Sequence, residues 1–177
     1  MRSAILLLSA VLMVSAAHGQ SSIPSRVADA ETTARVKTAL IANRATKATQ
    51  INVETLEGVV QLSGFVDSEM ARQAAVSTAR SIGGVSEVQD RLLIRDAGRT
   101  AGQAIDDTVI EAKLKSELAG SAGLGMASDV IVEVNSGIVE LSGFVPTHDQ
   151  KNRAAEIARR ISGVMDVKNN ITVKTRG

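Results

Sequence analysis

The sequence predicts an α+β fold: two tandem small αββαβ modules, each with two helices on one face of a three-stranded sheet, after a cleaved signal peptide. Three observations lead to this prediction. The chain repeats itself at an offset of 79 residues, each copy changes its hydrophobic period in the same order, and an apolar segment follows a basic residue at the N-terminus. We expect a signal peptide at 1–19, modules at 31–96 and 106–174, and a linker at 97–105.

The N-terminal segment is expected to direct export. Arg2 supplies a positive charge, and the apolar run from Ala4 to Ala17 is too short to span a bilayer. The small residues Ala17 and Gly19 favour cleavage before Gln20, and cleavage after Ala17 is the alternative. An uncleaved anchor or an N-terminal core helix is the competing interpretation. A Sec-type signal predicts a periplasmic protein with no transmembrane segment in its mature chain.

Each module is expected to begin with a helix and a β-hairpin. Apolar residues at helical spacing predict helices over 31–44 and 107–119, and Asp106 or Asp107 is the expected N-cap of the second. Alternation of apolar and polar residues then predicts two strands in each copy. They flank Leu-Glu-Gly in the first copy and Asn-Ser-Gly in the second, which are turn sequences whose glycine tolerates a positive φ.

A second helix and a last strand complete each module. Ser68 is the expected N-cap of this helix in the first copy, and Thr147 with Gln150 forms a capping box in the second. The glycines that match between the copies are expected to be structural: Gly58, Gly64, Gly84, Gly137, Gly143 and Gly163. At Gly64 and Gly143 we expect the missing side chain to let a helix cross the sheet closely.

The composition excludes several classes of function. The chain of 177 residues has 20 Lys and Arg against 19 Asp and Glu, no Cys, no Trp, no Tyr and two Phe. A balanced charge disfavours nucleic acid as a partner. Without cysteine there is no disulfide and no thiolate ligand for a metal, and two Phe cannot form a platform for stacking bases. The sequence therefore predicts an aliphatic protein that does not bind nucleic acid.

Residues suited to catalysis or metal binding are scarce. His148 is the only histidine after removal of the signal, and it stands at the expected start of a helix, where a solvated role is favoured. Ser63 and Ser142 precede glycines, but they lack a Gly-x-Ser-x-Gly elbow and a histidine to act as their base. We expect no catalytic residue, no metal site and no cofactor.

One motif, present in both copies, resembles a known family. The string Gly-x-Val-x-Leu-Ser-Gly-x-Val at 58–66 and 137–145, followed by Gly-Val-x-x-Val at 84–88 and 163–167, resembles the BON domain. Two tandem copies behind a signal peptide resemble periplasmic proteins of the OsmY type. The resemblance implies αββαβ modules that bind and do not catalyse. It also implies a role in phospholipid or envelope association, osmotic stress protection or periplasmic chaperoning.

Phe65 and Phe144 are the first candidate binding residues. They are the only aromatic residues, they occupy the same repeat position, and strand parity points them away from the face that carries Leu62 and Leu141. If helices cover one face only, the two phenylalanines form apolar patches on the other face. The alternative is that these faces pack on each other between the repeats, or on the first helix.

The second candidate is a basic surface on the last helix, formed by Lys151, Arg153 and Arg159. Residues 106–145 hold two basic and seven acidic residues, whereas residues 146–177 hold seven basic and three acidic residues. A basic end suits anionic lipid headgroups, at about 1 kcal/mol per well-placed cation. The alternative is that Glu156 pairs with its basic neighbours along a solvated helix.

Two functions remain open at this point. The first is a non-enzymatic binding module that associates with the cell envelope, through anionic phospholipid or a periplasmic or outer-membrane protein, in osmotic or envelope stress protection. The second is a periplasmic holdase-type chaperone that offers apolar sheet faces to unfolding clients.

Overall fold

The protein folds into two α+β modules of the same topology. The computed structural model describes residues 22–46, 51–95, 98, 100–121 and 129–174. The signal peptide expected at 1–19 lies outside the described residues. The elements of the first module are α1 (Ser22–Ala42), β1 (Ile51–Leu56), β2 (Val59–Val66), α2 (Glu69–Arg80), β3 (Glu87–Asp90) and β4 (Leu93–Ile94).

The second module repeats this order. Its elements are α3 (Ala101–Gly120), β5 (Val130–Asn135), β6 (Ile138–Val145), α4 (His148–Arg160), β7 (Asp166–Asn169) and β8 (Thr172–Val173). In each sheet the long second strand is central: β2 pairs antiparallel with β1 and parallel with β3 and β4, and β6 pairs in the same way in the second module.

The last expected strand of each module is divided in two, so each sheet has four strands rather than three. Side chains cause the interruption, because the carboxylate of Asp90 accepts the backbone N–H of Leu92 at 3.0 Å and the amide of Asn169 accepts that of Ile171 at 3.4 Å. The chain bends there, and Leu92 and Ile171 are buried in their cores.

Both leading helices start earlier than expected. α1 begins at Ser22 and not at residue 31, and α3 begins at Ala101, inside the segment expected to be a linker. The N-cap of α3 is Thr100, which forms a capping box with Gln103, so the expected cap at Asp106 or Asp107 is wrong. The sequence pattern detected only the part of each helix that packs on a sheet, because the first turns carry few buried residues.

Asp107 instead fastens α3 to the hairpin. This residue is 2% exposed, and its carboxylate accepts the backbone N–H groups of Ser136 and Gly137, both at 2.8 Å. The first module repeats the contact, since Asp29 accepts the N–H groups of Glu57 and Gly58. The carboxylates thereby satisfy backbone donors at turns that have no strand partner.

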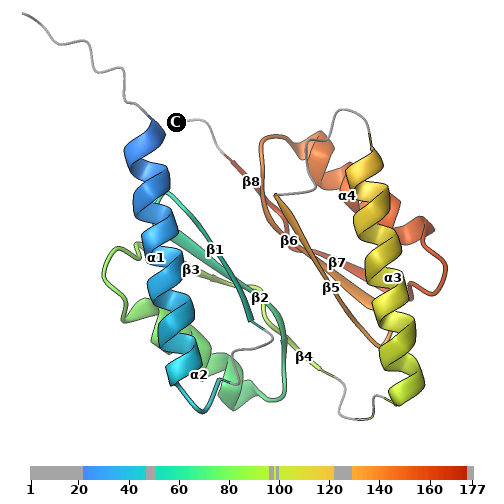
Figure 1. Cartoon of the computed structure of the whole chain (residues 1–177), viewed down its shortest axis with the longest axis horizontal. Coiled ribbons are helices and arrows are strands. Elements are labelled where there is room, and N and C mark those ends of the chain that lie inside the picture. The colour runs from blue at the N-terminus through green and yellow to red at the C-terminus, as the bar shows by residue number, and fades with distance from the viewer. Residues whose placement is uncertain (1–21, 47–50, 96–97, 99, 122–128, 175–177) are drawn as a thin grey trace, which may run out of the picture.

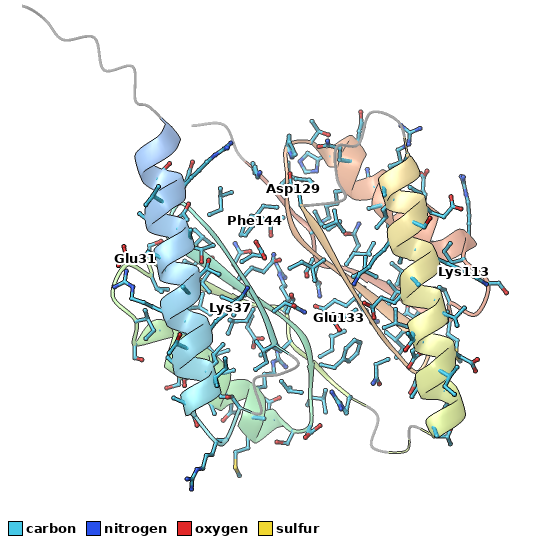
Figure 2. All side chains as sticks on the ribbon, viewed as in Figure 1. Glu31, Lys37, Lys113, Asp129, Glu133 and Phe144 are labelled. Atoms are coloured by element: carbon cyan, nitrogen blue, oxygen red, sulfur yellow. The ribbon has the colours of Figure 1, made fainter. Side chains whose placement is uncertain are left out.

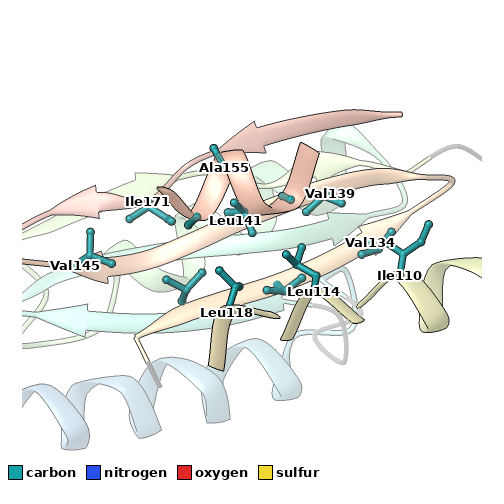
Figure 3. Packing of buried hydrophobic residues seen from close by; sticks show 13 residues of the cluster. Ile110, Leu114, Leu118, Val134, Val139, Leu141, Val145, Ala155 and Ile171 are labelled. Atoms are coloured by element: carbon teal, nitrogen blue, oxygen red, sulfur yellow. The ribbon is translucent and has the colours of Figure 1, made fainter. Parts of the chain in front are cut away.

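The second helices begin as predicted. Ser68 caps α2 by accepting the N–H of Ala71, and Thr147 forms a capping box with Gln150 at the start of α4. Each of these helices has three buried alanines: Ala71, Ala75 and Ala79 in α2, and Ala154, Ala155 and Ala158 in α4. Figure 3 shows the core of the second module, a single cluster that includes Leu114 and Leu118 of α3, Leu141 of β6 and Ala155 of α4. The first module has its own separate core.

The two sheets face each other, and the helices lie on the outside (Figure 1). α1 and α2 cover the outer face of the first sheet, and α3 and α4 cover that of the second. β2 and β6 approach each other across the middle of the molecule. We call this contact the junction; it is formed by the inward-facing side chains of Gln61, Ser63, Phe65, Glu140, Ser142 and Phe144.

The repeated glycines all have a positive φ: Gly58, Gly64, Gly84, Gly137, Gly143 and Gly163. The expected reason for Gly143, close passage of a helix, is wrong. Its φ is +106°, and a Cβ would collide with the backbone carbonyl of Asp129 at the start of the neighbouring strand. This conformation also directs the N–H of Gly143 away from β5 and into the junction.

We expect Gly143→Ala to lower the free energy of unfolding by about 3 kcal/mol, because it combines backbone strain with a collision against backbone atoms. Urea denaturation followed by circular dichroism measures the change. Gly83→Ala is the matched control, since a Cβ at Gly83 would meet no atom within 4 Å. Equal stability of the two variants would contradict this account of Gly143.

Candidate functional site

The junction is held by two reciprocal hydrogen bonds between side chain and backbone. Gln61 in β2 and Glu140 in β6 occupy the same repeat position. Oε1 of Gln61 accepts the N–H of Gly143 at 2.6 Å, and Oε2 of Glu140 accepts the N–H of Gly64 at 2.7 Å. In each module the glycine N–H has no partner within its own sheet. A strand side chain of the other module accepts it instead.

Ser63 and Ser142 lie between these two bonds. The hydroxyl of Ser142 donates to the hydroxyl of Ser63 at 2.8 Å, and both residues are 1% exposed. Ser63 and Ser142 occupy the same position in the repeat. Their contact therefore indicates a local two-fold relation between the modules. Both serines are structural at this position, with no histidine beside them among the described residues.

Further polar contacts close the edges of the junction. Asn52 of β1 donates to Glu133 of β5 at 2.9 Å. On the other side, Thr172 accepts from Gln61 at 2.9 Å and donates to Gln89 at 3.0 Å. The contact thus extends from the β1–β5 edge to the β3–β8 edge, and its polar groups are paired rather than left buried alone.

Phe65 and Phe144 are buried beside this polar centre. Their exposed fractions are 6% and 7%, and neither belongs to the hydrophobic core of its own module. As strand parity predicted, both rings lie on the sheet face opposite Leu62 and Leu141. These two faces do not form open patches; they pack on each other between the repeats. Figure 2 shows Phe144 between the two sheets. A partner can reach these rings only if the modules separate.

The basic residues of α4 do not form one cluster. Nζ of Lys151 donates to the carbonyl of Ile171 at 2.7 Å, so this ammonium is engaged within the module. Arg153 is exposed and lines a groove together with Glu156. Arg159 helps to lower the pKa of Asp166, although the main cause is the hydrogen bond of Asp166 with Lys168. The three cations thus face different neighbours.

An exposed apolar surface lies at one end of the second module. Ile105 and Val109 are one turn apart on α3 and are 67% and 46% exposed, and Met165, just before β7, is 82% exposed. We call these three residues the apolar edge. Val109 and Met165 line a cleft of about 340 Å³, together with Lys113 and Gly163.

Two of the three residues of the apolar edge, Val109 and Met165, differ in character from their counterparts in the first module. At the equivalent positions the first module has Glu31 in place of Val109 and Ser86 in place of Met165. An apolar residue that replaces a polar one at a solvent-facing position of a repeat indicates a surface with a separate role. Comparing the copies for differences, in addition to matches, would have found it.

His148 is the first residue of α4 and is exposed. No group of three or more His, Asp or Glu among the described residues is arranged to hold a metal ion. No described helix combines the length and apolar character needed to cross a membrane.

Comparison with known proteins gives a family model and curated relatives. The BON domain model matches residues 28–96 and 106–175. Over 154 residues the chain is 38% identical to Osmotically-inducible protein Y of Escherichia coli, covering 82% of this chain and 73% of that protein. Over 118 residues it is 34% identical to Outer membrane lipoprotein DolP of Haemophilus influenzae, covering 67% of this chain and 60% of that one.

Solved structures give a weaker likeness. The C-terminal domain of CdsD, a structural protein of the type III secretion system of Chlamydia trachomatis, matches with a TM-score of 0.33 and 18% identity, over 83% of this chain and 67% of that one.

We expect Phe144→Ala to lower the free energy of unfolding by about 3 kcal/mol, because it removes a ring buried in the junction. Thermal denaturation measures the loss. Met70→Ala is the control, since Met70 is 77% exposed on α2 and its truncation should change stability by less than about 0.5 kcal/mol. An unchanged melting temperature for Phe144→Ala would mean that the two sheet faces are open in solution.

Proposed function

Because the chain belongs to the BON domain family and carries two BON domains in tandem, we propose that it is an exported, non-enzymatic binding protein of the cell envelope. In this proposal the second module contacts anionic phospholipid and the protein acts in osmotic or envelope stress protection. Relatives named as osmotically inducible and as an outer membrane lipoprotein support the setting. The expected signal peptide and periplasmic location belong to the same proposal.

The apolar edge is the observation that carries the choice of partner. Ile105, Val109 and Met165 are large, exposed and grouped at one end of one module, where side chains of this kind favour insertion among lipid headgroups. Basic residues stand near it in the chain. Arg159 and Arg160 end α4, and the loop that follows lines the same cleft as Val109. Of these two cations, Arg159 acts electrostatically on Asp166, the residue that follows Met165. A cation near an apolar surface favours anionic lipid.

The holdase alternative receives less support. It requires apolar sheet faces that clients can reach, and the faces that carry Phe65 and Phe144 are packed together. An envelope protein as the partner of the apolar edge is the remaining alternative. Lipid and protein partners are separated by an experiment with pure lipid vesicles, which contain no protein.

We expect the triple variant Ile105→Ser, Val109→Ser and Met165→Ser to bind vesicles rich in phosphatidylglycerol at least about tenfold more weakly than the wild type, because it removes the side chains that would enter the lipid. Vesicle flotation measures binding. The matched control is Val27→Ser with Met70→Ser, which changes exposed apolar residues of the first module. If the wild type binds no vesicles and still suppresses aggregation of an unfolding client, the holdase function replaces this proposal.

We expect Arg153→Gln with Arg159→Gln to weaken vesicle binding by about 2 kcal/mol at low salt, at about 1 kcal/mol per cation. The difference should disappear at high salt, because salt screens exposed charges. Flotation across a salt series measures the effect, and Arg35→Gln with Arg80→Gln in the first module is the control. Equal weakening by both pairs would mean that the whole charge of the protein matters and α4 has no special part.

A further inference from the structure

Glu140 is an acidic residue in a place where the equivalent residue of the other module is neutral. It is 1% exposed, Oε2 accepts the N–H of Gly64 at 2.7 Å, and Oε1 accepts the side-chain N–H of Asn170 at 3.0 Å. At the same position in the first module, Gln61 makes the reciprocal bond to Gly143. The junction therefore has one neutral and one titratable half.

The charged groups around Glu140 do not neutralise it. Glu133 is its direct neighbour in β5, and Lys168 is its neighbour in β7 but pairs with Asp166 at 2.7 Å. From the first module, Arg91 acts on it only as a weak attraction. No Lys, Arg or His nitrogen in the described residues lies within ion-pair distance of the Glu140 carboxylate. The surroundings therefore favour a protonated side chain.

We propose that the junction is a proton-operated latch, in which protonation of Glu140 favours the closed arrangement of the two modules and loss of that proton loosens it. Geometry permits both states. A protonated Glu140 still accepts the N–H of Gly64 through its carbonyl oxygen, and its O–H can donate to Oδ1 of Asn170 once that amide turns over. The charged form keeps the same bonds but is desolvated between two sheets.

The direction of the pH dependence follows from the same surroundings. Burial raises the pKa of Glu140 from 4.5 to about 7, and the hydrogen bonds from Asn170 and Gly64 offset only part of this effect. Since the pKa is higher in the closed state, closing is most favourable below pH 4.5 and becomes less favourable as the pH rises to about 7. A shift of this size corresponds to about a 300-fold change in the closing equilibrium.

A second carboxylate near the junction acts in the same direction. Burial raises the pKa of Glu54 in β1, Lys37 lowers it, and Asp129 raises it again. Glu54 makes no hydrogen bond across the junction that resembles those of Gln61 and Glu140. Its contribution must still be separated from that of Glu140 by a variant of its own.

Nuclear magnetic resonance of the purified exported chain tests the proposal. The Glu140 carboxyl should titrate near pH 7. Hydrogen exchange of the Gly64 and Gly143 amides reports closing, because each donates across the junction. Relative to intrinsic exchange rates, their protection should fall by up to about 300-fold between pH 4.5 and 7.5.

Variants assign the effect to Glu140. Glu140→Gln, which copies Gln61, should make protection of Gly64 nearly independent of pH, and Gln61→Glu should enlarge the pH dependence by adding a second buried acid. Glu54→Gln should leave most of the pH dependence of this protection, and Glu117→Gln should leave all of it. The titration of Glu140 in the wild type stands as a test even if a variant fails to fold.

Three results would overturn the latch. The first is titration of Glu140 in the ordinary range near pH 4.5. The second is an unchanged pH dependence in Glu140→Gln. The third is an equal loss of protection at the buried strand residues Val60 and Val139, since exchange by global unfolding would mean that the modules do not separate by themselves.

Discussion

The uncovered face of each small sheet is the constraint on which the rest of this structure depends. Helices cover one face only, and the other face carries a phenylalanine and a backbone N–H with no partner in its own ladder. Joining the two bare faces buries both rings and pairs both donors. The positive φ of Gly64 and Gly143 serves this joint, because it turns their N–H groups toward the other module. The repeated Leu-Ser-Gly-Phe string is therefore a junction motif as well as a strand.

The two modules have the same fold, and two of the positions at which they differ matter for the surface and for the junction. The first leading helix has Glu31 where the second has Val109, and the neutral junction residue Gln61 has the acidic counterpart Glu140. The first change exposes apolar surface outside the junction, and the second puts a titratable group inside it. Neither change helps the fold. Exposed apolar area and a buried carboxylate both cost stability relative to the polar and neutral residues at the equivalent positions.

The sequence was sufficient to predict what is local. The repeat, the hairpin turns and the caps at Ser68 and Thr147 follow from short-range chemistry, and the structure contains them. The junction was beyond such reasoning, because parity assigns Phe144 to a face but does not say what covers that face. The role of Asp107 was missed for a similar reason: its partners are backbone donors at positions 136 and 137, and no residue type in the sequence marks them.

The junction and the apolar edge lie on opposite sides of the second sheet. Along β6, Leu141 points into the core under α3, while Glu140 and Ser142 point into the junction. Opening the junction leaves the core of the second module, and with it the apolar edge, in place. What opening changes is the position of the first module and the exposure of Phe65 and Phe144. A membrane-bound second module would then keep its lipid contact at any pH, while protonation of Glu140 would set whether the inner sheet faces are covered.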